Sequence, residues 1–103
     1  MTMRNRPTPV SDVLQEYLKA AGIEERILEA AVVPEWAERV GPAIAAVTEP
    51  LRTSAAGVLV VAVRSSAWLS ELKLMEREIL RRLNEGRTRG RIQRIRFVMA
   101  DGG

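Results

Sequence analysis

An unbroken apolar run, Val58-Leu59-Val60-Val61-Ala62-Val63, lies between Gly57 and Ser65. Its β-branched composition and its lack of alternation predict a strand that is covered on both faces. Ser65 and Ser66 then offer a hydroxyl N-cap, and the apolar residues that follow recur at helical spacing. The run therefore predicts a central strand that leads at once into a long amphipathic helix.

This helix has an apolar stripe on one side and a basic ridge on the other. At about 100° per residue, Leu74 falls on the solvent side and Glu76 falls inside the apolar arc. Because a buried unpaired carboxylate is costly, either Glu76 reaches out at an end of the groove or the helix changes phase near residues 73–77, and we favour the phase change. The predicted core residues are Trp68, Leu72, Ile79 and Leu83 of this helix and Phe97 of the last strand.

Shorter elements precede the central strand. A first helix is expected to begin at Ser11 or Asp12 and to end at Gly22, and a second to run from Glu24 to Pro34, where a kink or a new first turn is expected. Gly41-Pro42 should end one helical turn and start another. Residues 50–53 predict a short edge strand, kept short by Pro50, which turns back through residues 54–57 into the central strand.

The last strand and the chain ends complete the fold prediction. From Ile92 to Met99 the residues alternate, so that Phe97 faces the helices while Arg94 and Arg96 face outward. A helix joins this strand to the central one, so the two should be parallel with a right-handed crossover. We therefore expect an α+β fold in which N-terminal helices are followed by β-β-α-β, with a small sheet covered by helices on one face. Residues 9–99 would form a single domain, between a disordered arm at 1–8 and a frayed end at 100–103.

Composition argues against an enzyme. The 103 residues include no Cys and no His, which removes disulfides, thiol nucleophiles, the commonest zinc ligands and the usual general base. We expect no catalytic, metal or cofactor site. The N-terminus lacks the apolar core of a secretory signal, and no apolar run approaches the roughly 20 residues of a membrane span, so a cytoplasmic protein is expected.

Charge is distributed unequally along the chain. Residues 1–50 hold five basic and eight acidic side chains, a net charge of −3, whereas residues 51–103 hold eleven basic and five acidic, a net charge of +6, which together give the total of +3. This asymmetry suggests two partners, or one nucleic acid and one protein. Trp36, Glu35 and Glu38 are the candidate protein contacts, because Trp often anchors interfaces and the acids could meet a basic partner. Core packing is the alternative for Trp36 and the favoured interpretation of Trp68.

Seven arginines crowd the segment from residue 81 to residue 96. Arginine binds phosphates through a bidentate fork, and such a cluster is typical of a nucleic-acid footprint. The alternative is a solvated surface in which the arginines pair with Glu71, Glu78 and Glu85, but the loop itself holds no acid, which favours binding. No aromatic residue interleaves with them, which favours backbone contacts with little sequence preference. The candidate nucleic-acid residues are Arg81, Arg82, Arg87, Arg89, Arg91, Arg94 and Arg96.

Three segments carry a family resemblance: Trp36-Ala-Glu-Arg-Val-Gly-Pro-Ala-Ile-Ala-Ala-Val-Thr-Glu-Pro50, Gly57-Val-Leu-Val-Val-Ala-Val-Arg-Ser-Ser-Ala-Trp-Leu-Ser-Glu-Leu72, and Ile95-Arg-Phe97. Their order resembles the DciA family over roughly residues 10–98. The resemblance implies a KH-like α/β fold and a bacterial DNA-replication protein that binds DNA and helps to load the replicative helicase DnaB.

The chain also departs from the family pattern. Val47 stands where members often carry His, and only six residues follow Phe97, so a helicase contact made by a long tail is not carried over. No Gly-x-x-Gly loop of the kind that clamps strands in true KH domains is present. The resulting hypothesis is a non-enzymatic adaptor that bridges DNA, single- or double-stranded, and DnaB. A protein-only scaffold and an RNA-binding, ribosome-associated factor remain as alternatives. The oligomeric state and the surface that meets the helicase stay open.

Overall fold

The computed structural model describes residues 9–100, so the expected arm at 1–8 and the last three residues of the expected frayed end lie outside it. Three helices come first, followed by a strand, a 3-10 turn and a second strand. Two further helices and a third strand complete the chain. The elements are α1 (Pro9–Ala30), α2 (Val32–Val40), α3 (Pro42–Val47), β1 (Thr48–Ser54), η2 (Ala55–Gly57), β2 (Val58–Val63), α4 (Ser66–Leu74), α5 (Glu76–Asn84) and β3 (Arg94–Met99). This order confirms the predicted α+β architecture.

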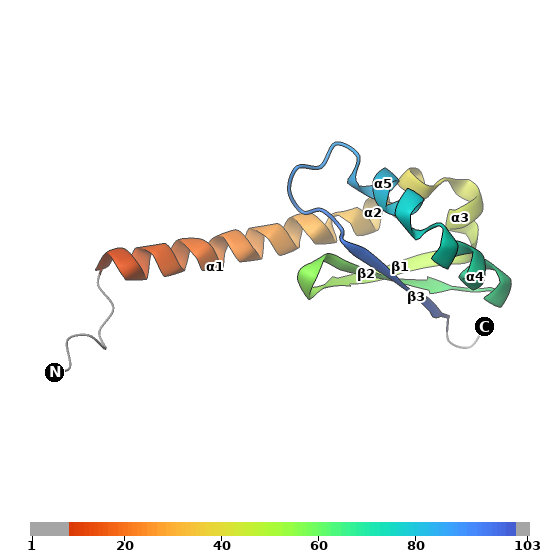
Figure 1. Cartoon of the computed structure of the whole chain (residues 1–103), viewed down its shortest axis with the longest axis horizontal. Helices are drawn as coiled ribbons and strands as arrows, with labels where there is room; N and C mark the ends of the chain where they lie inside the picture. Colours follow the sequence, from red (N-terminus) through yellow and green to blue (C-terminus); the bar gives the residue numbers. More distant parts are fainter. Residues whose placement is uncertain (1–8, 101–103) are drawn as a thin grey trace.

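The three strands form one sheet in the order β1-β2-β3. β1 and β2 are antiparallel and β2 and β3 are parallel, which confirms the predicted hairpin and the parallel return of the last strand. Figure 1 shows the shorter helices α2 to α5 gathered on one side of this sheet. The other face carries no helix in the described part of the chain, and we call it the open face.

The core lies between this sheet and the shorter helices. Leu59, Val61 and Val63 point toward the helices and are completely buried, together with Leu72, Ile79 and Leu83 of α4 and α5. Phe97 is buried in the same cluster, as predicted. β2 was predicted to be covered on both faces, and its residues from Leu59 to Val63 are all buried, although helices lie on one face of the sheet only in the described part of the chain. Val60 and Ala62 on the open face are only 6% exposed because they are small and lie in the central strand between two flanking strands.

Two predicted boundaries are wrong. Gly22 does not end a helix, because α1 continues through it to Ala30. A glycine inside a helix costs only about 1 kcal/mol, which the rest of the helix outweighs. Pro50 does not shorten β1, which starts at Thr48. Since β1 is an edge strand, the missing N–H of Pro50 is tolerated, and a bulge between Pro50 and Arg52 absorbs the irregularity.

The predicted helix after β2 breaks at Met75, whose φ of −94° and ψ of 4° are not helical. This break divides it into α4 and α5 and confirms the favoured phase change. Glu76 begins α5, and its side chain is half-buried, with Oε2 accepting the backbone N–H of Ile95 at 2.9 Å. Without the break, the Glu76 carboxylate would have fallen in the apolar arc. With the break, it binds a backbone N–H of β3.

α1 projects away from the rest of the molecule, and only its C-terminal end reaches the other helices (Figure 1). The radius of gyration is 18.5 Å, whereas a compact domain of this length would have about 13 Å. Most of the exposed large apolar side chains are on this helix. They include Val13, Leu14, Tyr17, Leu18, Ile23 and Ile27.

Candidate nucleic-acid interface

The structure separates the seven candidate arginines by the acids that they meet. Arg81 and Arg82 both bind Glu78, with N···O distances of 2.6 and 3.1 Å. Hydrogen bonds from Arg81 and then from Arg82 lower the pKa of Glu78 from 4.5 to about 2. Arg82 also donates to the backbone carbonyl of Val40 at 3.3 Å, so it helps to join α5 to α2. These two guanidinium groups are already paired with a neighbouring carboxylate of their own helix.

Arg87 is a structural residue of the loop between α5 and β3. Its side chain is only 11% exposed, and it binds Glu35 of α2 at 3.2 Å. It also donates to the carbonyls of Leu28 at 2.8 Å and of Gly90 at 3.1 Å. Arg87 was predicted to contact nucleic acid, but its guanidinium group is engaged by α1 and α2.

The next residues of the loop bind the C-terminal half of α1. Arg89 pairs with Glu24 at 2.5 Å and lies 3.7 Å from Glu25. The backbone N–H of Gly90 donates to Glu25 Oε2 at 2.6 Å. Gly90 has a φ of +65°, and a Cβ there would lie 2.8 Å from the carbonyl carbon of Leu28. Only glycine fits this contact, and we call residues 87–90 with their α1 and α2 partners the clasp.

The clasp explains why the composition of the loop was misleading. The loop holds no acid, as the sequence indicated, but acids about 50 to 65 residues earlier in the chain reach it. The negative first half and the positive second half of the chain therefore neutralise each other in part within one molecule. Arg91, the remaining loop arginine, is exposed and donates to the carbonyl of Arg87 at 2.8 Å.

Arg94 and Arg96 differ from the other candidates because they lie on the open face. Both are exposed, and the strand register places Arg52 of β1 in the same row as Arg96, with Val60 of β2 between them. None of the three forms an ion pair with a carboxylate among residues 9–100. Strand geometry sets the Cα atoms of Arg94 and Arg96 about 6.6 Å apart and those of Arg52 and Arg96 about 9.5 Å apart.

Arg52 was absent from the sequence-based candidates. It stands alone between Leu51 and Thr53, far from the dense arginine segment, so charge density gave no reason to select it. The hairpin prediction held a usable signal, because pairing of the two strands brings a residue of 50–53 beside the central strand. The open-face row consists of Arg52, Val60 and Arg96. Glu49 lies in the adjacent row, opposite Ala62, and is the one acid in the described rows of this face.

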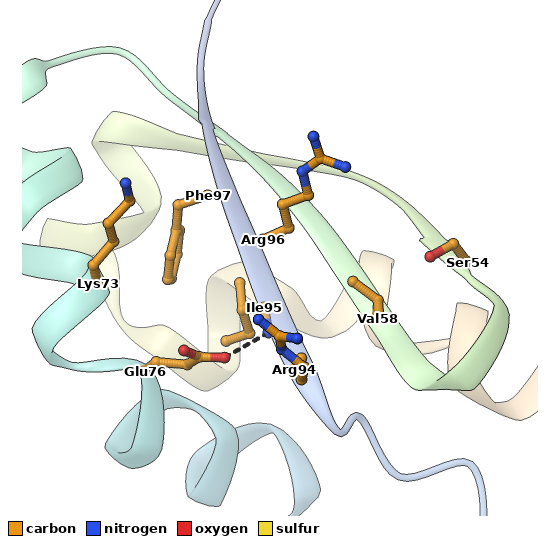
Figure 2. Close-up of a pocket in the computed structure, with 8 residues that line it drawn as sticks. All are labelled: Ser54, Val58, Lys73, Glu76, Arg94, Ile95, Arg96 and Phe97. Atoms are coloured by element: carbon orange, nitrogen blue, oxygen red, sulfur yellow. Dashed lines mark hydrogen bonds between the residues drawn. The ribbon is translucent and has the colours of Figure 1, made fainter.

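A groove of about 610 Å³ runs beside β3, next to the open face. Figure 2 shows Arg96, Val58 and Ser54 on one side of the strand and Lys73, Phe97 and Glu76 on the other. Its polar walls are therefore mostly cationic, with Glu76 held against the strand. The lining residues are Ser54, Val58, Lys73, Glu76, Arg94, Ile95, Arg96 and Phe97.

The three candidate protein contacts differ in how accessible they are in the structure. Trp36 is 2% exposed, and its indole N–H donates to Thr48 Oγ1 at 2.9 Å, so the prediction of a partner anchor is wrong for this residue. Glu35 is engaged by Arg39 and Arg87. Glu38 is exposed and lies beside a small surface hollow with Arg39. Trp68, predicted to start the buried stripe, is only partly buried at the margin of the core.

No group of three or more carboxylates among residues 9–100 is placed to hold a metal ion. No helix in that range is long and apolar enough to cross a membrane.

The fold and the surface together define a small α+β domain with an arginine-bearing open sheet face and a projecting amphipathic helix. The family model described as "Dna[CI] antecedent, DciA" matches residues 9–97, and the chain belongs to the DciA family. This confirms the resemblance seen in the sequence.

Similar proteins come from Rhodococcus and Mycobacterium species. The chain is 30% identical over 94 residues to UPF0232 protein RHA1_ro03670 of Rhodococcus jostii, covering 89% of this chain and 48% of that protein. It is 31% identical over 77 residues to UPF0232 protein Rv0004 of Mycobacterium tuberculosis and to UPF0232 protein ML0004 of Mycobacterium leprae, covering 75% of this chain and 41% and 40% of those proteins. The chain thus spans less than half the length of these relatives.

Proposed function

We propose that this chain is a non-enzymatic adaptor of bacterial DNA replication that binds DNA and helps to load the replicative helicase DnaB in the cytoplasm. Family membership supports the helicase role. The observation that carries the DNA half is the open-face row: Arg52 and Arg96, with Arg94 in the next row, lack carboxylate partners among the described residues. Unpaired guanidinium groups are the ones free to bind phosphate.

The composition of the open face indicates how DNA would be bound. Its central positions are the small apolar residues Val58, Val60 and Ala62, and its rows contain no aromatic side chain on which a base could stack. Binding through arginines alone contacts the phosphate backbone and carries little sequence information. We therefore expect similar affinity for unrelated sequences and a strong dependence on salt.

The protein half of the proposal uses α1. Leu14, Tyr17 and Leu18 lie on the projecting part of this helix, and each is more than half exposed. An amphipathic helix with an uncovered apolar face is suited to docking on another protein. Trp36 is buried, so α1 takes its place as the candidate surface that meets DnaB, and Glu38 remains as an exposed acid nearby on α2.

The bridging role can be tested with immobilised DNA. DnaB, under conditions in which it does not bind the DNA alone, should be retained on the DNA when this protein is added. The triple variant Arg52→Gln, Arg94→Gln, Arg96→Gln should lose this retention but still capture DnaB directly in the absence of DNA. The double variant Leu14→Ser, Tyr17→Ser should bind DNA normally and fail to capture DnaB. A variant with Arg64→Gln, Arg77→Gln and Arg81→Gln loses the same charge outside both the open-face row and α1 and is the control.

Two outcomes would replace the proposal. If the wild-type protein captures DnaB but binds no nucleic acid at low salt, it is a protein-only scaffold, and the clasp shows how its loop arginines would be neutralised. If it binds single-stranded RNA at least about tenfold more tightly than DNA of the same sequence, the RNA-binding alternative is favoured.

A further inference from the structure

β3 is an edge strand, and one side of its backbone faces away from β2. The N–H of Ile95 points outward, because it donates to Glu76 and not to the neighbouring strand. The N–H of Ala100 points inward and donates to the carbonyl of Val63 at 2.8 Å. Since backbone groups alternate in direction along a strand, the N–H and C=O groups of Phe97 and Met99 point outward with those of Ile95. This edge offers peptide groups at the spacing of an added strand.

Glu76 occupies the first position along this edge. Its Oε2 lies 2.9 Å from the amide nitrogen of Ile95, where the carbonyl oxygen of a further strand would accept the same hydrogen bond. Glu76 is the first residue of α5, and the N-cap residue before it, Met75, makes no side-chain hydrogen bond to the helix. An acidic oxygen from α5 therefore stands in for the backbone of an additional strand at one peptide group.

The groove beside the edge is cationic. Three of its lining residues, Lys73, Arg94 and Arg96, carry positive charge, and Glu76 is the only acid among them (Figure 2). None of the three cations is ion-paired within residues 9–100. Apolar surface from Val58, Ile95 and Phe97 completes the lining. A ligand that supplies acidic groups and an extended backbone would complement both properties.

We propose that this edge binds an extended acidic peptide segment of a partner protein by strand addition to β3. In this mode the main chain supplies affinity and the side-chain pockets supply specificity. The partner strand would bond the outward groups of Phe97 and Met99, while its acidic side chains would lie near Lys73, Arg94 and Arg96. A peptide fits better than a nucleic acid, because the edge presents alternating donors and acceptors and the Phe97 ring, at 8% exposed, is not available for stacking.

This surface goes beyond the proposed adaptor role, although Arg94 and Arg96 belong to both sites. A partner segment seated here would compete with DNA for these two arginines. Release of Glu76 from Ile95 would extend the paired edge by one peptide group. Glu76 is thus an edge guard that limits how far a partner strand extends.

The test uses the full chain and two probes, a capped peptide of four Glu-Val repeats and oligothymidylate. Amide hydrogen exchange is measured at Phe97 and Met99, and saturation with the acidic peptide should slow it by at least about fivefold, as expected for a hydrogen bond of about 1 kcal/mol. Oligothymidylate should leave both amides unprotected. A matched peptide of Lys-Val repeats should not bind.

The comparison of Met99→Pro with Met99→Ala makes one arm of the test independent of charge. Met99→Pro removes an outward N–H without removing a hydrogen bond to β2. It should lower the affinity for the acidic peptide by at least about fivefold relative to Met99→Ala. Glu76→Ala should raise the affinity for the acidic peptide by a similar factor. The proposal is overturned if the Glu-Val peptide leaves the two amides unprotected or if oligothymidylate protects them to the same extent. It is also overturned if the Lys-Val peptide binds with the same affinity as the Glu-Val peptide. If Met99→Pro does not fold, the wild-type protein alone is sufficient for the test. The proposal is overturned when the acidic peptide does not slow amide exchange at Phe97 and Met99 of the wild type.

Discussion

The loop at residues 87–91 and the open face of the sheet are both rich in arginine, but they use it differently. In the loop, Arg87 and Arg89 are bound by Glu35, Glu24 and Glu25, so that their charge fastens α1 and α2 to the rest of the domain. On the open face, Arg52 and Arg96 lie on either side of Val60, and neither has a carboxylate partner among residues 9–100. The comparison teaches that the sequence shows where cations are dense, whereas the fold decides which of them lack a carboxylate partner.

The largest effect should come from filling the space at Gly90. Gly90→Ala must hold a left-handed conformation and push Cβ against Leu28, which together should cost about 3 kcal/mol of unfolding free energy. Gly22→Ala is the matched control, because nothing lies within 4 Å of its Cβ, and it should stabilise α1 by about 1 kcal/mol. Urea unfolding measures both. Equal stability of the two variants would contradict the close contact between the loop and α1.

Removing Arg87 should have the next largest effect. Arg87→Gln loses a charge-assisted bond to Glu35 and two bonds to backbone carbonyls, and it should destabilise the fold by about 2 kcal/mol. DNA affinity at a temperature where the variant is folded should change little. Arg96→Gln should do the reverse, with stability within about 0.5 kcal/mol of the wild type and weaker DNA binding. The comparison fails if Arg87→Gln keeps full stability and loses DNA affinity.

Releasing Arg89 should convert a clasp residue into a DNA contact. The double variant Glu24→Gln, Glu25→Gln removes the acids that hold Arg89, and the exposed pairs should cost less than about 1 kcal/mol each. The freed guanidinium should steepen the dependence of log affinity on log salt by about one unit. Replacing Glu16 and Glu71, which form no ion pair in the described structure, gives the charge-matched control. If the salt dependence steepens equally in both variants, the change in net charge alone is responsible.

The smallest effect concerns Glu78. Its pKa is lowered to about 2 by Arg81 and Arg82, so its stabilising contribution is present above the unfolded value of 4.5 and is lost as the pH falls toward 2. Glu78→Gln should therefore be slightly less stable than the wild type at pH 7, and the gap should close between pH 4.5 and pH 2. Melting temperatures across this range measure it. A gap that persists unchanged at pH 2 would exclude ionisation as the cause.

Much of the fold could be predicted from the sequence because local periodicity carries it. The apolar run at 58–63 identified β2, the alternation before Met99 identified β3 with Phe97 inward, and the misplaced Glu76 indicated the break between α4 and α5. Trp68 packs against the margin of the core, whereas the burial of Trp36 was underestimated. Val32, Trp36 and Val40 are spaced four residues apart and form a buried stripe on α2. The break expected at Pro34 hid this stripe, because it divided the pattern. Proline is nevertheless tolerated in the first turn of a helix, where Pro34 lies.

The candidate site could be predicted only in part, because pairing between distant residues decides which arginines are available. Arg94 and Arg96 were located correctly on the outward side of the last strand. The partners of Arg87 and Arg89 lie 52 and 65 residues away, where no local pattern connects them. Arg52 reaches the same face only through the register of the hairpin. Tertiary contacts, not composition, separate the two groups.

The central claim is that DNA is bound by the unpaired arginines of the open face and not by the paired ones. It is tested most directly by comparing two triple variants of equal charge, Arg52→Gln, Arg94→Gln, Arg96→Gln and Arg81→Gln, Arg82→Gln, Arg89→Gln. The slope of log affinity against log salt should flatten by about two units or more in the first, since each lost phosphate contact removes about 0.7 to 0.9 units, and by less than one unit in the second. Equal flattening in both variants, or a larger loss in the second, would contradict the account.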